Sequence, residues 1–291
     1  MRFFVLLVLV FLNLNLFAQN IPARWDELTA SDWPLALEKS NKTIILPIGI
    51  LEKHGPHAPM GSDLIRVREL AKMAAEKEYA VIFPDYFYGQ VNEAKHIQGT
   101  FSLPVDITLD LLQATCDEIA RNGFEKIFII NGHGGNPQLL RYFVQTQMEK
   151  DRGYAVFFHE PEMGSSVRDQ VSKMRKSDPA TDQHGGENET SILLHLRPEL
   201  VKLERATAES GENLGRLGEL PNVYTAIWWY ANYPLHYAGE GNVATPELGK
   251  VITNENVRSI VESLRAVKQD TTTMYLQKRY FEEVEKVSGA R

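Results

Sequence analysis

The sequence has very little cysteine and no excess of basic charge. Its 291 residues include one cysteine, Cys116, so no disulfide can form within the chain. No catalytic-cysteine signature surrounds Cys116, and we expect it to be a buried core residue. The formal net charge is -7 at pH 7, which argues against nucleic acid or another polyanion as the main partner. The sequence shows no internal repeat and no low-complexity segment.

A long hydrophobic run is found only at the N-terminus. Arg2 precedes an apolar stretch over residues 3–12, and the pattern ending in Phe17-Ala18-Gln19 resembles a secretory signal peptide cleaved after Ala18. The apolar stretch is too short to span a bilayer comfortably, and no cysteine near Ala18 offers a lipid attachment point. A buried N-terminal strand or helix is the alternative. We therefore expect residues 1–18 to be removed and residues 19–291 to be exported, periplasmic or secreted, as a single domain without a membrane span.

Strand-like and helix-like segments alternate along the mature chain. Runs of β-branched and apolar residues predict strands over residues 43–51, 80–83, 126–130 and 154–159. Helical spacing predicts helices over residues 64–77, 106–122 and 138–150. Asn136-Pro137 would begin the last of these as N-cap and first helical residue. This alternation is typical of an α/β fold, in which a mostly parallel sheet is covered by helices on both faces.

Residues of metal-binding type follow the first predicted strand. The segment Leu-Glu-Lys-His-Gly-Pro-His-Ala-Pro-Met-Gly-Ser-Asp, residues 51–63, contains Glu52, His54 and Asp63. If the strand continues briefly past residue 51, Glu52 and His54 project from the same face, because they are two residues apart. Asp63 returns after a turn rich in glycine and proline. The segment therefore predicts a metal site.

Two further loops combine histidine or carboxylate with glycine. Asn131-Gly-His-Gly-Gly-Asn136 follows a predicted strand and offers His133 at the strand end. The segment 182–191 adds three more candidate ligands: His184, Glu187 and Glu189. Any one of these residues could simply be solvated or complement a helix dipole. Because ligands of open α/β sheets bind beyond the carboxyl ends of the strands, we expect the three loops to converge on one site.

Taken together, these motifs resemble the creatininase family of metal-dependent amidohydrolases, and in particular its branch with the Asn-Gly-His-Gly-Gly-Asn motif. The resemblance covers roughly residues 25–260. It rests on four segments in the family's order: residues 52–57 with Asp63, 99–103 (Gly-Thr-Phe-Ser-Leu), 131–136 and 184–191. It implies a three-layer α/β/α fold, two divalent ions of zinc or manganese type, and a homo-oligomer, frequently a hexamer. The implied activity is hydrolysis of a non-peptide C–N bond in a cyclic or small amide such as creatinine, by water activated at the two metal ions.

The resemblance also implies a role for each residue of the first two loops. Glu52 and His133 would bind one ion, His54 would bind the other, and Asp63 would bridge the pair. A carboxylate shared in this way holds two ions close enough to act on one substrate. Imidazole combined with carboxylate oxygen suits Zn²⁺ or Mn²⁺ better than Ca²⁺ or Mg²⁺.

One residue departs from the pattern of creatininase itself. There, a glutamate ligand follows the loop histidine by two residues, whereas this chain has Gly135 two residues after His133. We expect the missing carboxylate to come from the later loop, with Glu189 as first candidate and Glu187 as second. His184 would be the general acid and base, and Glu187 is a further catalytic candidate.

The sequence says less about the substrate. Trp228, Trp229 and His96 are candidates for substrate contact, since aromatic faces suit a flat or cationic ring. The two tryptophans could equally belong to the core or to a subunit interface. A metallopeptidase or formamide hydrolase on the same fold, and an inert metal- or ligand-binding protein, remain alternatives.

Overall fold

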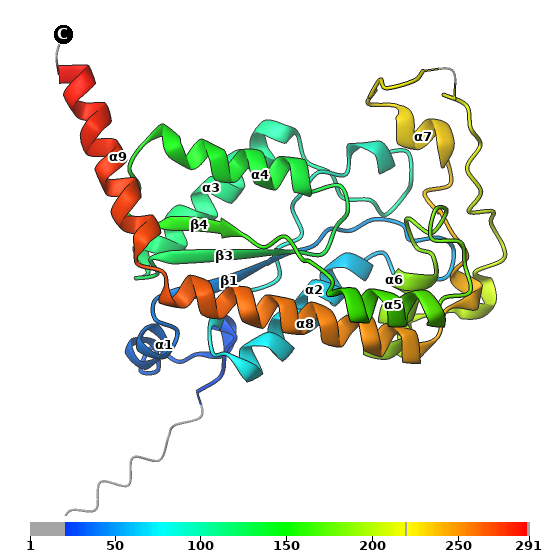
Figure 1. Cartoon of the computed structure of the whole chain (residues 1–291), viewed down its shortest axis with the longest axis horizontal. Helices are drawn as coiled ribbons and strands as arrows, with labels where there is room; N and C mark the ends of the chain where they lie inside the picture. Colours follow the sequence, from blue (N-terminus) through cyan, green and yellow to red (C-terminus); the bar gives the residue numbers. More distant parts are fainter. Residues whose placement is uncertain (1–20, 219, 290–291) are drawn as a thin grey trace, which may run out of the picture.

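A parallel four-stranded sheet lies at the centre of the molecule (Figure 1). The computed structural model describes residues 21–289 except residue 219, so the predicted signal peptide lies outside the described residues. The strand order is β2-β1-β3-β4, and each neighbouring pair is parallel. The strands are β1 (Thr43–Ile48), β2 (Val81–Ile82), β3 (Lys126–Asn131) and β4 (Ala155–Phe158).

Helices cover both faces of this sheet (Figure 1). The α2 and α8 helices pack on one face, and α3 and α4 pack on the other. In β3, Ile127 and Ile129 enter the core shared with α3 and α4, whereas Phe128 and Ile130 enter the core shared with α2 and α8. This is the two-residue period of a strand with both faces buried. The helices are α2 (Ser62–Lys77), α3 (Val105–Arg121), α4 (Pro137–Thr146) and α8 (Pro246–Gln269). The prediction of an α/β fold with layers α/β/α is confirmed.

The other helices surround the ends of the sheet or extend from it. Gly249 of α8 lets α6 come very close, because a Cβ at this position would lie 1.9 Å from the carbonyl oxygen of Ser191. The α-helices in addition to α2, α3, α4 and α8 are α1 (Trp33–Lys39), α5 (Ser165–Met174), α6 (Glu187–Leu196), α7 (Trp228–Asn232) and α9 (Thr272–Gly289). The 3-10 helices are η1 (Trp25–Glu27), η2 (Asn92–Ala94), η3 (Gln147–Glu149), η4 (Pro198–Leu200), η5 (Leu203–Arg205) and η6 (Gly241–Val243). None of the helices within the described ranges is long and apolar enough to cross a membrane.

One expectation about local structure needs correction. The first strand ends at Ile48, so Glu52 and His54 lie in a loop and do not share a strand face. Asn136 is the N-cap residue of α4 and Pro137 its first residue, as expected, and the Asn136 side chain makes no capping hydrogen bond. Cys116 of α3 is buried in the core, as expected, and burial raises the pKa of its thiol.

Candidate metal centre

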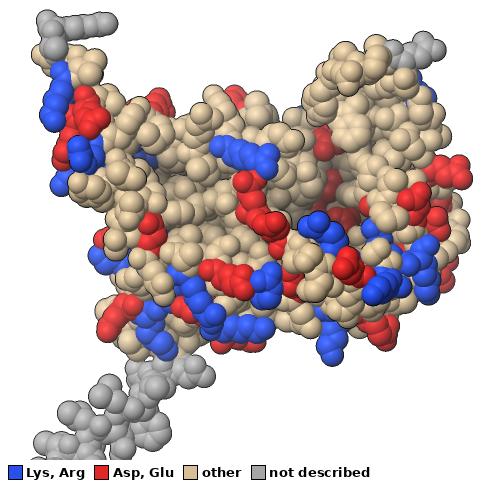
Figure 2. Space-filling view, viewed as in Figure 1, with Lys and Arg blue, Asp and Glu red and all other residues tan. Residues whose placement is uncertain are grey.

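Five of the predicted ligands come together beyond the carboxyl ends of β1 and β3. Glu52 and His54 lie in the loop after β1, and His133 lies in the loop after β3. Asp63 is in the first turn of α2, and Glu189 is in the first turn of α6. All except Glu189 are buried. A recess beside α7, with acidic side chains at its bottom, is visible in Figure 2.

Glu52, Asp63 and His133 form the first group of possible ligands. His133 Nδ1 lies 2.8 Å from Glu52 Oε1 and 3.0 Å from Asp63 Oδ2. The other ring nitrogen, Nε2, lies 2.8 Å from the carbonyl oxygen of Gln90. Because a carbonyl oxygen only accepts hydrogen bonds, Nε2 carries the hydrogen and Nδ1 faces the carboxylates. Metal-binding histidines usually make this kind of outward hydrogen bond.

His54, Asp63 and Glu189 form the second group. His54 Nε2 lies 3.1 Å from Asp63 Oδ1 and 3.7 Å from Glu189 Oε2. His54 Nδ1 donates to the main-chain oxygen of Glu52 at 3.3 Å. Asp63 thus presents Oδ2 to the first group and Oδ1 to the second, which is the arrangement of a bridging carboxylate.

Unpaired buried polar atoms in the first group indicate whether these residues fit metal ions. Among the residues that the structure describes, Glu52 Oε1, Asp63 Oδ2 and His133 Nδ1 have no hydrogen-bond partner. Buried polar atoms are rarely left unpaired, because desolvation without a partner is unfavourable. A cation placed between these atoms would satisfy all three. Nitrogen and carboxylate ligands in both groups suit zinc or manganese, so the residues fit two divalent ions.

The charges in the cluster favour the binding of cations. Burial alone would lower the pKa of His54, but the neighbouring carboxylates, above all Asp63, raise it to about 10. The pKa of His133 also lies well above its usual value, because Glu52 and Asp63 outweigh the effect of burial. Burial opposes the ionisation of Glu52, yet His133 and His184 hold its pKa well below the usual range. Protons and a divalent ion would thus compete for the ring nitrogens that face the carboxylates.

His184 faces both ligand groups from the loop that precedes α6. Its Nε2 donates to the main-chain oxygen of Lys53 at 2.7 Å, which leaves the Nδ1 lone pair turned toward the cluster. Nδ1 lies 4.0 Å from Glu52 Oε1 and 3.8 Å from Glu189 Oε2. Burial, followed by the charge of His54, lowers the pKa of His184. A neutral imidazole in this position can accept a proton inside the site.

Glu187, predicted as a catalytic residue and as the second choice of ligand, lies outside the cluster. Its buried carboxylate accepts hydrogen bonds from Lys176 N and from both N and Oγ of Ser177, at 2.7 to 3.0 Å. Side chains two residues apart on a helix point about 200° away from each other, so Glu187 and Glu189 cannot face the same site. The predicted role of Glu187 is therefore corrected to a structural one, which ties the turn after α5 to α6.

Asparagine side chains shape the loop that carries His133. Asn131 Oδ1 accepts from His133 N at 3.1 Å, and Asn131 Nδ2 donates to His133 O at 2.6 Å. Asn136 donates to Asn131 Oδ1 at 3.1 Å and accepts from Gln90 N at 2.9 Å. A Cβ at Gly135 would lie 2.5 Å from His133 Nε2. A side chain at position 135 would thus disturb the hydrogen bond between His133 and Gln90.

The three candidates for substrate contact lie at different distances from the centre. The ring of Trp229 lies edge-on to that of His184, with centroids 5.7 Å apart. Trp228 packs instead against Trp229 and Tyr224. His96 is exposed, and its Nε2 donates to the main-chain oxygen of Pro234 at 2.7 Å. Within the described part of the chain, neither Trp228 nor His96 makes a hydrogen bond, ion pair or ring contact with the cluster.

His236 belongs to the site although the sequence did not single it out. Its Nε2 lies 2.6 Å from Glu52 Oε2, and the residue is buried. It lies 184 positions from Glu52 along the chain, at no fixed spacing from any metal-binding motif. The sequence offers one weak signal for His236: it lies in residues 220–239, a segment without Asp, Glu, Lys or Arg.

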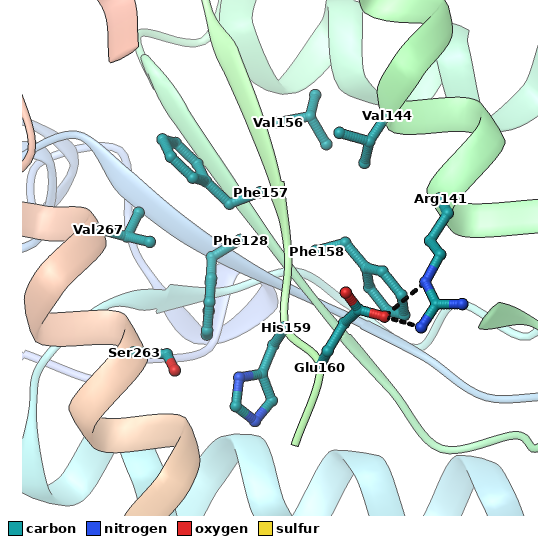
Figure 3. Close-up of a pocket in the computed structure, with 10 residues that line it drawn as sticks. All are labelled: Phe128, Arg141, Val144, Val156, Phe157, Phe158, His159, Glu160, Ser263 and Val267. Atoms are coloured by element: carbon teal, nitrogen blue, oxygen red, sulfur yellow. Dashed lines mark hydrogen bonds and ion pairs between the residues drawn. The ribbon is translucent and has the colours of Figure 1, made fainter. Parts of the chain in front are cut away.

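A separate pocket of about 420 Å³ lies at the end of β4 (Figure 3). Arg141 and Glu160 form an ion pair at its wall, and His159 lies within it. Burial lowers the pKa of His159 to about 4, and its Nε2 lies 3.5 Å from Ser259 Oγ. None of the residues that line this pocket belongs to the candidate metal-binding cluster.

The comparisons with known proteins show the family of this chain. The model of the creatininase family, described as creatinine amidohydrolase, matches residues 26–264. The chain belongs to the creatininase family. Similar proteins include a mycofactocin precursor peptide peptidase of Mycobacterium ulcerans (strain Agy99), 27% identical over 80% of this chain and 86% of that protein. The creatinine amidohydrolase of Pseudomonas putida is 29% identical over 62% of this chain and 74% of that protein. A 3-dehydro-scyllo-inosose hydrolase of Thermotoga maritima is 25% identical over 78% of this chain and 76% of that protein.

Solved creatininase structures share the fold. A crystal structure of creatinine amidohydrolase matches with a TM-score of 0.69 at 22% identity, covering 86% of this chain and 99% of that chain. A manganese creatininase also matches with a TM-score of 0.69 at 22% identity, covering 85% of this chain and 99% of that chain. The resemblance to the creatininase family and the expected fold are both confirmed.

Proposed function

We propose that this creatininase-family hydrolase cleaves a C–N bond of a small or cyclic amide at a centre of two divalent metal ions. The observation that carries the proposal is the position of Asp63, which presents one carboxylate oxygen to each of two ligand groups. Related proteins include a creatinine amidohydrolase and a manganese creatininase, which supports both the reaction class and the choice of metal.

Each ligand group would hold one ion. Glu52 and His133 would bind the first, His54 and Glu189 would bind the second, and Asp63 would be shared. When bound, the ions would supply Lewis acidity, which polarises a substrate carbonyl and lowers the pKa of water. The protein fixes the orientation of both imidazoles through main-chain hydrogen bonds, so the ligands are in place before an ion arrives.

His184 would move the proton during hydrolysis. Its Nδ1 accepts a proton from the attacking water, and the same proton then passes to the leaving nitrogen as the C–N bond breaks. The hydrogen bond to Lys53 fixes the ring, and the edge of Trp229 packs against it. A lowered pKa keeps His184 neutral near pH 7 and so ready to accept the proton.

Cleavage of a peptide bond in a short apolar peptide is the second candidate. It is favoured by the segment 220–239, which lacks charged side chains and contributes Trp229 to the centre. The same segment exposes Val223, Tyr224 and Ile227 to solvent, as a surface for an apolar peptide requires. A relative named as a peptide peptidase supports this candidate as well.

The test is a substrate panel on metal-loaded protein. The panel contains creatinine and other lactams, formamides and short apolar peptides, each measured before and after chelation and after metal add-back. Hydrolysis of lactams or small amides that is lost on chelation supports the first candidate, and preference for peptides supports the second. Full activity in verified metal-free protein refutes the metal-dependent reaction. If the loaded protein hydrolyses nothing in the panel, an inert metal-binding protein is the better description.

Export and assembly are further proposals. Cleavage after Ala18 is tested by the intact mass of protein recovered from the periplasm or medium. Homo-oligomerisation, as a hexamer by family resemblance, is tested by light scattering.

A further inference from the structure

Two hydrogen bonds connect Trp229 to Glu52 through His236. Trp229 Nε1 lies 2.8 Å from His236 Nδ1, and His236 Nε2 lies 2.6 Å from Glu52 Oε2. An indole nitrogen only donates hydrogen bonds, so His236 Nδ1 must accept. The ring therefore carries its hydrogen on Nε2 and donates it to Glu52. The hydrogen-bond partners Trp229 and Glu52 therefore determine the tautomer of His236.

Because of this hydrogen bond, the two carboxylate oxygens of Glu52 have different surroundings. Oε2 is held by His236, whereas Oε1 lies 2.8 Å from His133 Nδ1 and has no hydrogen-bond donor among the described residues. Glu52 is 1% exposed and His236 is 2% exposed, so water competes little with the contact. Hydrogen bonds from a neutral donor to a buried carboxylate are among the stronger ones in proteins.

The backbone at His236 is held in an unusual conformation. Its φ of 53° lies in the left-handed region, which only a few per cent of residues other than glycine adopt, histidine, asparagine and aspartate more often than the rest. Such a conformation persists only where the surroundings determine it. Here the main-chain N–H of His236 donates to Tyr233 O at 3.0 Å, and the ring lies 4.6 Å from that of His184. The chain after α7 thus turns sharply and presents the ring to the centre.

We propose that His236 is a positioning residue that restricts Glu52 to a single ligand oxygen, and that Trp229 keeps His236 in the tautomer this requires. The inference rests on the proposed two-metal centre. It assigns His236 to the ion held by Glu52, Asp63 and His133, because Glu52 Oε1 lies 2.8 Å from His133 Nδ1 but 3.9 Å from His54 Nε2. Loss of the hydrogen bond between His236 and Glu52 should lower the affinity for this ion and leave the affinity for the other ion unchanged.

Three substitutions separate this role from a general effect on folding. His236→Asn tolerates the left-handed backbone but is too short to reach Glu52. His236→Gln restores an N–H donor near the position of Nε2. Trp229→Phe keeps an aromatic ring and removes the indole donor, and Trp228→Phe is its matched control on the same helix, since Trp228 makes no hydrogen bond to the cluster among the described residues.

The measurement is a zinc titration of the full-length mature protein against a chromophoric chelator, with the visible spectrum of the cobalt-loaded protein as second readout. The wild-type protein should bind two ions. We expect His236→Asn to weaken one of them by about 10–100-fold and to leave the other unchanged. His236→Gln should recover most of the affinity, Trp229→Phe should show a smaller loss at the same ion with an altered cobalt spectrum, and Trp228→Phe should match the wild type.

The possible results are distinguishable. The positioning role would be overturned if His236→Asn lowered the affinity for both ions equally or for neither. It would also be overturned if His236→Gln bound zinc as weakly as His236→Asn. If His236→Asn does not fold, the comparison of Trp229→Phe with Trp228→Phe decides, and equal behaviour of the two overturns the inference. If the wild-type protein binds fewer than two ions, the two-metal centre itself is wrong.

Discussion

Replacing Glu189 by glutamine should remove one metal ion and leave the fold almost unchanged. The Glu189 side chain is 23% exposed, and its Oε2 accepts a hydrogen bond from Gly185 N at 2.7 Å. The oxygen of a glutamine can keep this hydrogen bond, so we expect the stability of the metal-free protein to change by less than about 1 kcal/mol. The charge that would bind the second ion beside His54 and Asp63 is lost, however.

Glu187, two residues away on α6, provides the matched control with the opposite result. Its carboxylate accepts from Lys176 N, Ser177 N and Ser177 Oγ, and the residue is fully buried. In Glu187→Gln the NH₂ group would face the Lys176 donor, and the remaining hydrogen bonds would lose their charge assistance. With about 1.5–3 kcal/mol for a hydrogen bond to a charged group, we expect a loss of about 2–4 kcal/mol. This corresponds to a decrease of about 5–15 °C in Tm.

The assay combines metal content with thermal unfolding of the metal-free protein. Glu189→Gln should retain one ion per chain with nearly wild-type Tm, whereas Glu187→Gln should retain two ions with a lowered Tm. Both variants are purified without chelators and loaded with the same zinc excess. The reasoning is refuted if Glu189→Gln keeps two tightly bound ions, or if Glu187→Gln loses an ion while its Tm is unchanged.

Three further predictions follow from the geometry of the centre. Because the carboxylates raise the pKa of His54 to about 10 and that of His133 well above its usual value, metal binding must displace their protons. Metal affinity should therefore rise with pH, with about one to two protons released, and calorimetry in buffers of different ionisation enthalpy should detect them; an absence of proton release would contradict the assignment of these ligands. His184→Ala should keep both ions and lower turnover by about 10²–10⁴-fold, and unchanged turnover would exclude the proton-transfer role. Gly135→Ala should weaken zinc binding, because its Cβ would displace His133 from Gln90; wild-type affinity in this variant would show that the loop adapts freely.

The parts of the fold that are fixed locally could be predicted from the sequence. A continuous apolar run such as Ile127 to Ile130 identifies a buried strand, and the glycines after it mark a loop where ligands gather. Glu52 and His133 were therefore recognisable as candidates at strand ends. The expectation of a strand through residue 51 was wrong because the chain leaves the sheet after Ile48.

Other parts of the site depend on packing between distant segments. Glu187 and Glu189 lie two residues apart in one motif, so the local sequence does not distinguish them. The rotation of α6 about its axis decides which carboxylate faces the centre. Trp228 and Trp229 differ in the same way on α7. His236 comes near Glu52 through the turn after α7, and no local pattern records that contact.

The central claim is that Asp63 is shared by two metal ions. A crystal structure of the zinc-loaded protein, with anomalous scattering measured on both sides of the zinc absorption edge, tests it most directly. We predict two anomalous peaks on opposite sides of the Asp63 carboxylate, one beside Glu52 and His133 and the other beside His54 and Glu189. A single peak, or a second peak without Glu189 as a ligand, would contradict the account.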